Sequence, residues 1–462
     1  MSDALWTHSA TGLAEMIATK QVTSREVVDA HLDRIAAVNP ALNAVTVEMA
    51  DAAQTAADAA DATDPIGPLH GVPITIKENI DQVGYATTQG VAALADAMPP
   101  INAPTLQRML DAGAIPIGRT NMPELGLRVS TENSFRGLTR NPWDFERTAG
   151  GSSGGEGSAI ASGMSPLGLG NDIGGSVRNP ALCCGIAALK PGYGRIPRVA
   201  SLPPTEPGIS AQLMAVEGPM ARTVADLRLS YEILSGRVPS DPRIADAPLD
   251  GAAVARRCGV VRQLEGTQIS AGTMAAVDAA AAAMTAAGYE VVEVEPPDLA
   301  ATHAVWMHLL AFDFGASIPL LKLVMGVDEI RLLETLVDHA DQLAVPPQQV
   351  FMDRMRLQKA WSQMFADTPI VIGPGWTNPP FAHGADVEAG HEIDLLESQL
   401  SFVVPANVLG LPVVALANTV TDGLPAGVQI YADHWREDLC LTGAAIVEAA
   451  SAPITPIDPV WL

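Results

Sequence analysis

Near the N-terminus, hydrophobic residues recur with the period of a helix. Val28, Leu32 and Ile35 fall on one stripe, and such a stripe packs a helix against a core. Thr23 and Glu26 precede the stripe with the spacing of a capping box, in which each side chain accepts a hydrogen bond from a free N–H group of the first turn. The pattern therefore predicts a helix that begins just after Thr23.

Further along, the period changes from that of a helix to that of a strand. Val72, Ile74 and Ile76 alternate with other residues, which predicts a strand with one buried face. Lys77 ends this strand, at a place where its side chain can be largely desolvated. Two prolines and a glycine within residues 64–68 separate the strand from an alanine-rich helix predicted over 52–62.

The rest of the chain alternates between these two patterns. Helices are predicted over residues 103–113, 153–162, 177 onward, 275–286 and through 300–365. Strands are predicted over residues 114–118, 166–170, 258–262, 289–295, 369–373, 413–416 and 427–430. Residues 121–150 are predicted to be rich in loops, and the C-terminal part is predicted to be strand and loop.

Two stretches rich in glycine and serine stand out from this background. They are residues 148–158 and 171–180, and each surrounds one serine, Ser152 or Ser176, with glycines. Glycine has no Cβ, so the neighbouring backbone N–H groups can point at a reacting atom. The second stretch follows a predicted strand and precedes a predicted helix, which places Ser176 at a turn.

Composition and charge narrow the class of protein. The 462 residues are 48% hydrophobic and 17% charged, which is a globular composition with length for one to three domains. No apolar run reaches about 18 residues, and the N-terminus lacks the basic and apolar regions of a signal peptide. The net charge of -25 argues against a nucleic-acid or anionic-membrane partner, which would need clustered Lys and Arg.

The cysteines indicate the compartment. Cys183, Cys184, Cys258 and Cys440 have neither the spacing of a disulfide framework nor that of a metal site. They fit small buried side chains in a reducing compartment, so we expect a cytoplasmic protein. We expect neither a metal ion nor another cofactor.

A serine hydroxyl is a weak nucleophile and needs a base beside it. Residues 150–154 match the Gly-x-Ser-x-Gly elbow of Ser-His-Asp esterases, but that motif needs a preceding strand, and 141–147 lacks the pattern of one. The nine histidines stand in no motif. A buried lysine is the alternative base, because burial depresses a lysine pKa by up to about 3–5 units. Of the five lysines, Lys77 is the one that ends an alternating apolar strand.

Several separated motifs together resemble those of the amidase signature family. They include residues 71–79 (GVPITIKEN), 150–155 (GGSSGG) and 172–181 (DIGGSVRNPA). Further matches at 130–134, 137–142, 189–191, 218–223 and 423–429 extend the resemblance over nearly the whole chain. It implies a single α/β domain over 1–462, an α/β/α sandwich with a twisted mixed sheet covered by helices. The signature core would span about 70–230, and a variable helical region at the substrate pocket about 300–365.

The resemblance also implies roles for particular residues. In a Ser-cisSer-Lys triad, Lys77 would be the base, Ser152 the bridging serine on a cis peptide bond, and Ser176 the nucleophile. The oxyanion hole would be formed by the N–H groups of Ile173, Gly174, Gly175 and Ser176. The residues expected to contact the substrate are Ser130, Thr131 and Gly151.

Three neighbouring side chains are expected to be structural. The Ser153 hydroxyl is predicted to form a hydrogen bond within the glycine loop. Asp172 and Arg178 are predicted to form an ion pair that braces the turn around Ser176.

These roles describe a serine hydrolase of C–N bonds that works through an acyl-enzyme. Residues 300–365 are rich in bulky apolar side chains, and the chain has no basic cluster for an anionic substrate. It therefore resembles the broad-specificity bacterial amidases, whose substrates include amides, anilides, esters and urethanes (carbamates). We expect a small-molecule amide or carbamate as the partner, no nucleic acid, no membrane, and a homodimer as often found in the family.

Two alternatives stay open. Residues 130–134 resemble the amidase-like subunit of a tRNA-dependent amidotransferase, which releases ammonia from glutamine or asparagine. However, Ile173 and Asn179 stand where those subunits usually carry Thr and Gln. The other alternative is the Ser-His-Asp esterase. Nothing supports a binding protein that has lost catalysis, because all three triad residues are present.

Overall fold

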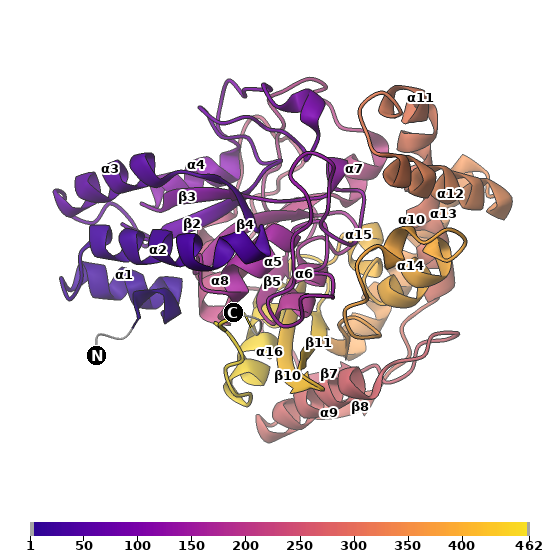
Figure 1. Cartoon of the computed structure of the whole chain (residues 1–462). Helices are drawn as coiled ribbons and strands as arrows, with labels where there is room; N and C mark the ends of the chain where they lie inside the picture. Colours follow the sequence, from indigo (N-terminus) through magenta and orange to yellow (C-terminus); the bar gives the residue numbers. More distant parts are fainter. Residues whose placement is uncertain (1–3, 460–462) are drawn as a thin grey trace.

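An 11-stranded sheet runs through the computed structural model, which describes residues 4–459. The strands follow the order β1-β3-β2-β4-β6-β5-β10-β11-β9-β7-β8, with both parallel and antiparallel neighbours. Helices pack on both faces of the sheet (Figure 1). This arrangement is a mixed sheet between helical layers, so the fold class expected from the sequence is confirmed.

The elements have the following bounds. The strands are β1 (Val45–Glu48), β2 (Pro73–Lys77), β3 (Ile115–Thr120), β4 (Leu167–Asp172), β5 (Ala187–Lys190), β6 (Val216–Ala221), β7 (Arg257–Val260), β8 (Glu290–Glu293), β9 (Ile370–Pro374), β10 (Val413–Thr421) and β11 (Leu424–Tyr431). The α-helices are α1 (Ala10–Ala18), α2 (Ser24–Leu42), α3 (Ala50–Asp61), α4 (Pro104–Asp111), α5 (Gly154–Ala161), α6 (Arg178–Cys184), α7 (Ile209–Met214), α8 (Val224–Leu234), α9 (Ala271–Ala286), α10 (Leu299–Phe314), α11 (Ile318–Leu321), α12 (Val327–Leu343), α13 (Pro347–Asp367), α14 (Glu392–Leu400), α15 (Pro405–Leu409) and α16 (Glu437–Ala449). The 3-10 helices are η1 (Leu5–Thr7), η2 (Ala92–Leu94), η3 (Glu124–Gly126), η4 (Gly315–Ser317) and η5 (Ala385–Val387).

Most elements expected from the sequence are present at the expected places. Thr23 and Glu26 form the predicted capping box at the start of α2, with both reciprocal hydrogen bonds. The helical region predicted through 300–365 is confirmed as α10 to α13. The four cysteines are buried free thiols, as their spacing indicated.

The C-terminal part differs from the expectation of strand and loop, because it also contains α14, α15 and α16. In α16, Leu441, Ala444 and Val447 are buried at helical spacing, but the alanines and glycine around them weaken the contrast between its two faces. The strands β1, β5 and β6 are also absent from the prediction. Strand β5 is buried on both faces, so its sequence does not alternate.

Strand β2 is buried on both faces, whereas the sequence predicts one buried face. It lies between β3 and β4 in the sheet, so helices cover it from both sides. Ile74 and Ile76 belong to the hydrophobic core on one side. Thr75 and Lys77 point to the opposite side, where they meet α5 and the loop before it. The strand therefore carries Lys77 into the interior.

One helical run is apolar enough to cross a membrane by length and composition alone. The run Leu299–Leu321 covers α10, η4 and α11 and has a mean hydropathy of 1.5. The sequence contains no uninterrupted apolar stretch of this length here. A third of the apolar window is buried, and within the run α10 packs against α7, α12, α13 and α15. Asp313 in this run accepts hydrogen bonds from two N–H groups at the start of α7. The run thus belongs to the helical layer on one face of the sheet.

Buried polar contacts tie this helical layer to the loop that follows β3. The Gly326 N–H group, just before α12, donates to the Glu124 carboxylate at 2.6 Å. Arg128 donates to Glu329 on α12 at 3.0 Å and forms two hydrogen bonds with Asp386 on η5. All three charged side chains of this second group are buried. Such a network fixes the position of α12 against the loop.

Candidate functional site

Lys77 ends β2 with its side chain fully buried. Its Nζ donates to Ser152 Oγ at 2.7 Å and to Asn171 Oδ1 at 2.8 Å. Burial lowers the Lys77 pKa to about 7, although the Asp172 carboxylate opposes this shift. Near neutral pH a fraction of the lysine is therefore uncharged, and an uncharged amine can accept a proton from the serine hydroxyl beside it.

Lys190 shows that burial alone does not single out Lys77. It ends β5, is equally buried, and its pKa is likewise lowered to about 7, first by burial and then by the Arg178 charge. The sequence did not reveal it as a second lysine at a strand end. Its Nζ, however, donates to the Pro191 carbonyl oxygen at 2.7 Å, and within residues 4–459 it forms no hydrogen bond with a serine. Contact with a serine, rather than the pKa, distinguishes Lys77.

The loop before α5 presents Ser152 to Lys77. The Gly151–Ser152 peptide bond is cis. A Cβ on Gly151 would lie 2.7 Å from the Arg128 carbonyl oxygen and from the Ser130 nitrogen, so only glycine fits there. On the other side, a Cβ on Gly126 would lie 3.2 Å from Ser152 Oγ. Backbone on two sides thus confines the Ser152 side chain, of which 2% is exposed.

Ser176 lies on the turn between β4 and α6, and Asp172 holds that turn. The Asp172 carboxylate accepts hydrogen bonds from the N–H groups of Gly175 (2.8 Å) and Val177 (3.2 Å). It also accepts two hydrogen bonds from Arg178, both at 3.0 Å, which confirms the predicted ion pair. Burial opposes ionisation of Asp172, but the Arg178 guanidinium outweighs it and holds the carboxyl pKa well below its usual range.

The hydrogen bonds of this turn separate its N–H groups into two sets. The Gly175 N–H group, expected in the oxyanion hole, is taken by Asp172, because a φ of +96° turns the Gly175 backbone inward. Within residues 4–459, no protein group accepts a hydrogen bond from the N–H groups of Ile173, Gly174 or Ser176. Only these three are therefore available to a ligand in this geometry.

The opposite side of the turn is held through its carbonyl groups. Trp306 on α10 donates its indole N–H to the Ile173 carbonyl oxygen at 3.0 Å, and a Cβ on Gly174 would meet the Trp306 ring. The Asn179 side chain donates to the Gly174 carbonyl oxygen at 3.2 Å. These contacts fix the peptide planes, and with them the directions of the free N–H groups.

The two glycine-rich loops are in contact with each other. The Ser153 N–H group donates to the Ser176 carbonyl oxygen at 3.0 Å, and the Asn179 amide donates to the Gly151 carbonyl oxygen at 3.3 Å. The prediction that the Ser153 hydroxyl bonds within the loop is wrong, because this buried hydroxyl has no partner in the described residues. The backbone of Ser153, rather than its side chain, connects the loops.

Ser130 and Thr131 lie under the glycine loop with their hydroxyl groups engaged. Ser130 Oγ accepts from Thr148 Oγ1 at 2.9 Å. Thr131 Oγ1 donates to the Gly150 carbonyl oxygen at 2.9 Å and accepts from the Gly154 N–H group at 3.0 Å. Both side chains are buried and brace the loop, and the substrate contacts expected for them and for the neighbouring glycine stay a prediction.

Glu156 is a buried acid of this site that the sequence did not single out. It lies on the first turn of α5 and accepts hydrogen bonds from Thr75 Oγ1 (2.6 Å) and Thr120 Oγ1 (2.9 Å). A side chain at Gly168 on β4 would overlap its carboxyl group. Burial raises the Glu156 pKa to about 8, so its carboxyl group is mostly protonated at pH 7. In the sequence, Glu156 could have been noticed as an acidic residue among glycine, serine and alanine.

Asn171 and Trp306 were also missed as members of the site. Asn171 stands in the second glycine-rich stretch, next to Asp172, but only the pairing of β2 with β4 brings it to Lys77. Trp306 comes from a helix distant in sequence, and no local pattern connects it to Ile173.

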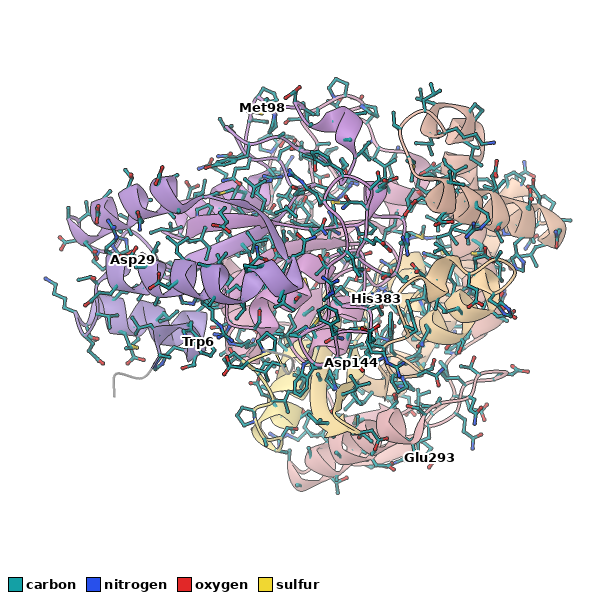
Figure 2. All side chains as sticks on the ribbon, viewed as in Figure 1. Trp6, Asp29, Met98, Asp144, Glu293 and His383 are labelled. Atoms are coloured by element: carbon teal, nitrogen blue, oxygen red, sulfur yellow. The ribbon has the colours of Figure 1, made fainter. Side chains whose placement is uncertain are left out.

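A loop from the C-terminal half covers the first glycine loop. The Thr148 N–H group donates to the Phe381 carbonyl oxygen at 2.9 Å, and His383 Nε2 lies 3.0 Å from the Phe145 carbonyl oxygen. His383 and Asp144, both labelled in Figure 2, mark these two segments. This contact places the covering loop directly beside the start of the glycine loop.

The arrangement does not support a Ser-His-Asp triad. Within residues 4–459, no histidine forms a hydrogen bond with Ser152, Ser153 or Ser176. No strand leads into the Gly-x-Ser-x-Gly sequence, as the elbow motif requires. The same part of the chain contains no group of three His, Cys, Asp or Glu side chains that could hold a metal ion.

Comparison with known proteins gives matches along nearly the whole chain. The family model Amidase matches residues 26–441. The indoleacetamide hydrolase of Bradyrhizobium diazoefficiens is 38% identical over 454 residues, which cover 96% of this chain and 86% of that protein. A glutamyl-tRNA(Gln) amidotransferase subunit from Salinispora tropica is 33% identical over 501 residues, covering 98% of this chain and 99% of that one. The structure of 6-aminohexanoate cyclic dimer hydrolase complexed with substrate matches with a TM-score of 0.83 at 29% identity, over 99% of each chain.

Proposed function

Because this chain belongs to the amidase family and is a hydrolase of amide C–N bonds, we propose that Ser176 is its nucleophile, Ser152 its bridging serine and Lys77 its base. The observation that carries this proposal is the 2.7 Å hydrogen bond between Lys77 Nζ and Ser152 Oγ in a fully buried place. The contact between the Ser153 and Ser176 backbones supports it, because it brings the two serine loops together.

The proposed reaction is an acyl transfer served by one relay of two proton transfers. Uncharged Lys77 takes the proton of Ser152, Ser152 takes the proton of Ser176, and Ser176 Oγ attacks the amide carbonyl carbon. The relay then runs backwards and delivers the proton to the leaving nitrogen as the C–N bond breaks. Water attacks the acyl-enzyme by the same relay and releases the carboxylic acid.

The negative oxygen of the tetrahedral intermediate is assigned to the free N–H groups of Ile173, Gly174 and Ser176. Loss of one such donor typically costs about 2.7–4 kcal/mol in the transition state. Gly175 has a different role in this proposal, since its N–H group holds the Asp172 carboxylate.

The substrate proposed is a small amide with an aromatic or alkyl body. The similarity to a protein named indoleacetamide hydrolase agrees with such a substrate. Aryl carbamates and esters are further proposed substrates, because they offer the same carbonyl carbon to Ser176.

Labelling with an alkyl fluorophosphonate, followed by peptide mass spectrometry, tests the nucleophile. We expect a single adduct on the peptide that contains Ser176, and none on the Ser176→Ala variant. An adduct on Ser152 or Ser153 in the wild-type protein would refute the assignment. Indole-3-acetamide, an acyl anilide and an aryl carbamate then test the substrate class, with release of ammonia or aryl leaving group as the readout.

The similarity to the amidotransferase subunit supports a second candidate function, release of ammonia from glutamine within a complex. Ile173 and Asn179 disfavour it, because those subunits usually carry Thr and Gln at these places. Glutamine is therefore included in the same assay. Ammonia release from glutamine, but not from indole-3-acetamide, would favour the second function over the first.

A further inference from the structure

A cavity of about 920 Å³ is lined by residues of α10, α14 and the loop that follows β7. Both helices are on the right-hand side of Figure 1. Neither Ser152 nor Ser176 lines it. Its apolar lining includes Leu264, Leu299 and Met307. Pockets for small organic ligands typically measure about 300–1,000 Å³, so the size of this cavity suits such a molecule.

One side chain in this cavity lacks the partners that a buried polar group needs. His303 on α10 lines the cavity with 7% of its surface exposed, and neither ring nitrogen has a hydrogen-bond partner in the described residues. Burial, with a smaller effect of His339, lowers the His303 pKa to about 4, so the ring is neutral at pH 7. A neutral imidazole has one nitrogen that accepts a hydrogen bond. The wall of the cavity therefore contains a buried ring in which both an acceptor nitrogen and an N–H donor are unpaired.

The charged groups around the cavity are predominantly acidic. Glu265, Glu295 and Asp394 line it, and within residues 4–459 none of them forms an ion pair. Asp298 and Glu397 also line it and are paired with an arginine and a histidine respectively. No lysine or arginine is among the described residues that line the cavity. Unpaired carboxylates around a concave site attract a cation.

We propose that this cavity binds a protonated organic amine with an apolar body. The ammonium group donates a hydrogen bond to His303 and is attracted by the unpaired carboxylates of Glu265, Glu295 and Asp394. The apolar body packs against Leu264 and its apolar neighbours. This ligand site is distinct from the serine site and does not depend on the proposed triad.

The cavity is nevertheless adjacent to the catalytic turn. The His303 ring packs against the Trp306 ring, with 5.6 Å between the centroids, and Trp306 in turn donates to the Ile173 carbonyl oxygen. A ligand on His303 would thus lie one aromatic side chain away from the turn that carries Ser176.

Isothermal titration calorimetry of the full chain with 2-phenylethylamine tests the proposal, at pH 7 and low ionic strength. We expect one binding site with a Kd on the order of 0.1–1 mM. The neutral analogue 2-phenylethanol should bind roughly tenfold or more weakly, since a hydrogen bond to a charged group is lost. His303→Phe, which keeps a ring against Trp306, should weaken amine binding roughly tenfold.

Two controls locate the binding. The double variant Glu265→Gln/Glu295→Gln should weaken binding even if His303→Phe does not fold. Glu293→Gln should not, because Glu293, labelled in Figure 2, lies on β8 near Arg262 and does not line the cavity. Protein labelled on Ser176 with the fluorophosphonate should bind the amine as before.

The proposal is overturned if the amine and the alcohol bind equally, or if no heat of binding is found at millimolar amine. It is also overturned if His303→Phe folds and binds the amine like the wild type. Loss of binding after labelling of Ser176 would place the amine at the serine site and refute a separate cavity site.

Discussion

Lys77 Nζ lies 2.7 Å from Ser152 Oγ, and neither side chain has more than a trace of exposed surface. The second partner of Nζ is Asn171 Oδ1, which can only accept, so the lysine retains one geometry in both protonation states. The uncharged amine keeps two N–H donors and gains a lone pair, so it can accept from Ser152 while it still donates to Asn171. Only the uncharged form of Lys77 can therefore take the Ser152 proton.

The first prediction concerns the pH dependence of catalysis. Since the Lys77 pKa is about 7 and the uncharged form is the base, kcat/KM should fall about tenfold per pH unit below pH 7 and level off above it. Hydrolysis of a neutral anilide between pH 5.5 and 9 measures this. A flat profile would contradict the role of Lys77. Lys190→Met, which removes the other buried lysine, should retain activity while Lys77→Met should not.

The second prediction concerns stability at Lys77. Its pKa is about 7 in the folded chain against an ordinary lysine value of 10.5, so between pH 7 and 10 the unfolded chain binds more protons and wild-type stability rises with pH. Lys77→Met removes this contribution. As pH rises, the free energy of unfolding of the wild type should therefore increase relative to that of the variant by up to about 1.4 kcal/mol per pH unit. Urea unfolding at pH 7 and pH 9 tests the difference. Equal differences at both pH values would mean that Lys77 stays charged.

The third prediction has the opposite sign. The Glu156 pKa is raised to about 8 from 4.5, so the folded state holds a proton that the unfolded chain loses, and wild-type stability falls as pH rises towards 8. Glu156→Gln should therefore gain in melting temperature relative to wild type from pH 5 to pH 8. Glu232→Gln, at an exposed position, is the control and should show no such trend.

The fourth prediction concerns the ion pair under the turn. Arg178→Gln leaves the Asp172 carboxylate buried without its guanidinium, which should destabilise the fold by about 3–5 kcal/mol. The double variant Asp172→Asn/Arg178→Gln removes the buried charge as well and should recover part of that loss. Urea unfolding measures the free energy of unfolding of both variants and so tests this expectation. A double variant less stable than Arg178→Gln would argue against an uncompensated charge as the cause.

The fifth prediction concerns Trp306 as a positioning residue. Trp306→Phe keeps an aromatic ring against Gly174 but loses the hydrogen bond to the Ile173 carbonyl oxygen. We expect kcat to fall roughly tenfold with little change in KM, because the N–H groups of the turn lose their alignment. The matched control is Trp361→Phe, which loses a similar hydrogen bond to the Pro297 carbonyl oxygen, away from the turn. Equal losses in kcat for both variants would point to a general structural effect.

Local patterns were sufficient to predict the strand that carries Lys77 and the helix that begins after Thr23. They were sufficient because each pattern involves neighbours in sequence. The glycine-rich stretches pointed to Ser152 and Ser176, and the residues around Ser176 to the ion pair of Asp172 with Arg178, whose contact at 3.0 Å the structure confirms. The resemblance to a family led further, to the roles proposed for the two serines and Lys77.

Other features depend on tertiary structure and left no local signal. The resemblance implied four N–H groups in the oxyanion turn, and the structure shows through the φ of Gly175 that one of them faces Asp172. The burial of β2 on both faces follows from its place in the sheet, which no alternation within 73–77 reveals. Lys190 resembles Lys77 in burial, and only the atoms around each lysine separate them.

The links between the helical layer and the catalytic half suggest where this chain tolerates recombination. Glu124 and Arg128 each bind α12 or its start, and Trp306 reaches Ile173 from α10. A chimera that exchanges residues 300–365 for those of a relative would have to keep a carboxylate at the place of Glu329 and an indole at that of Trp306. Asp313, which accepts from two N–H groups at the start of α7, is a third fixed point, and the buried positions of α10 to α13 would have to stay apolar.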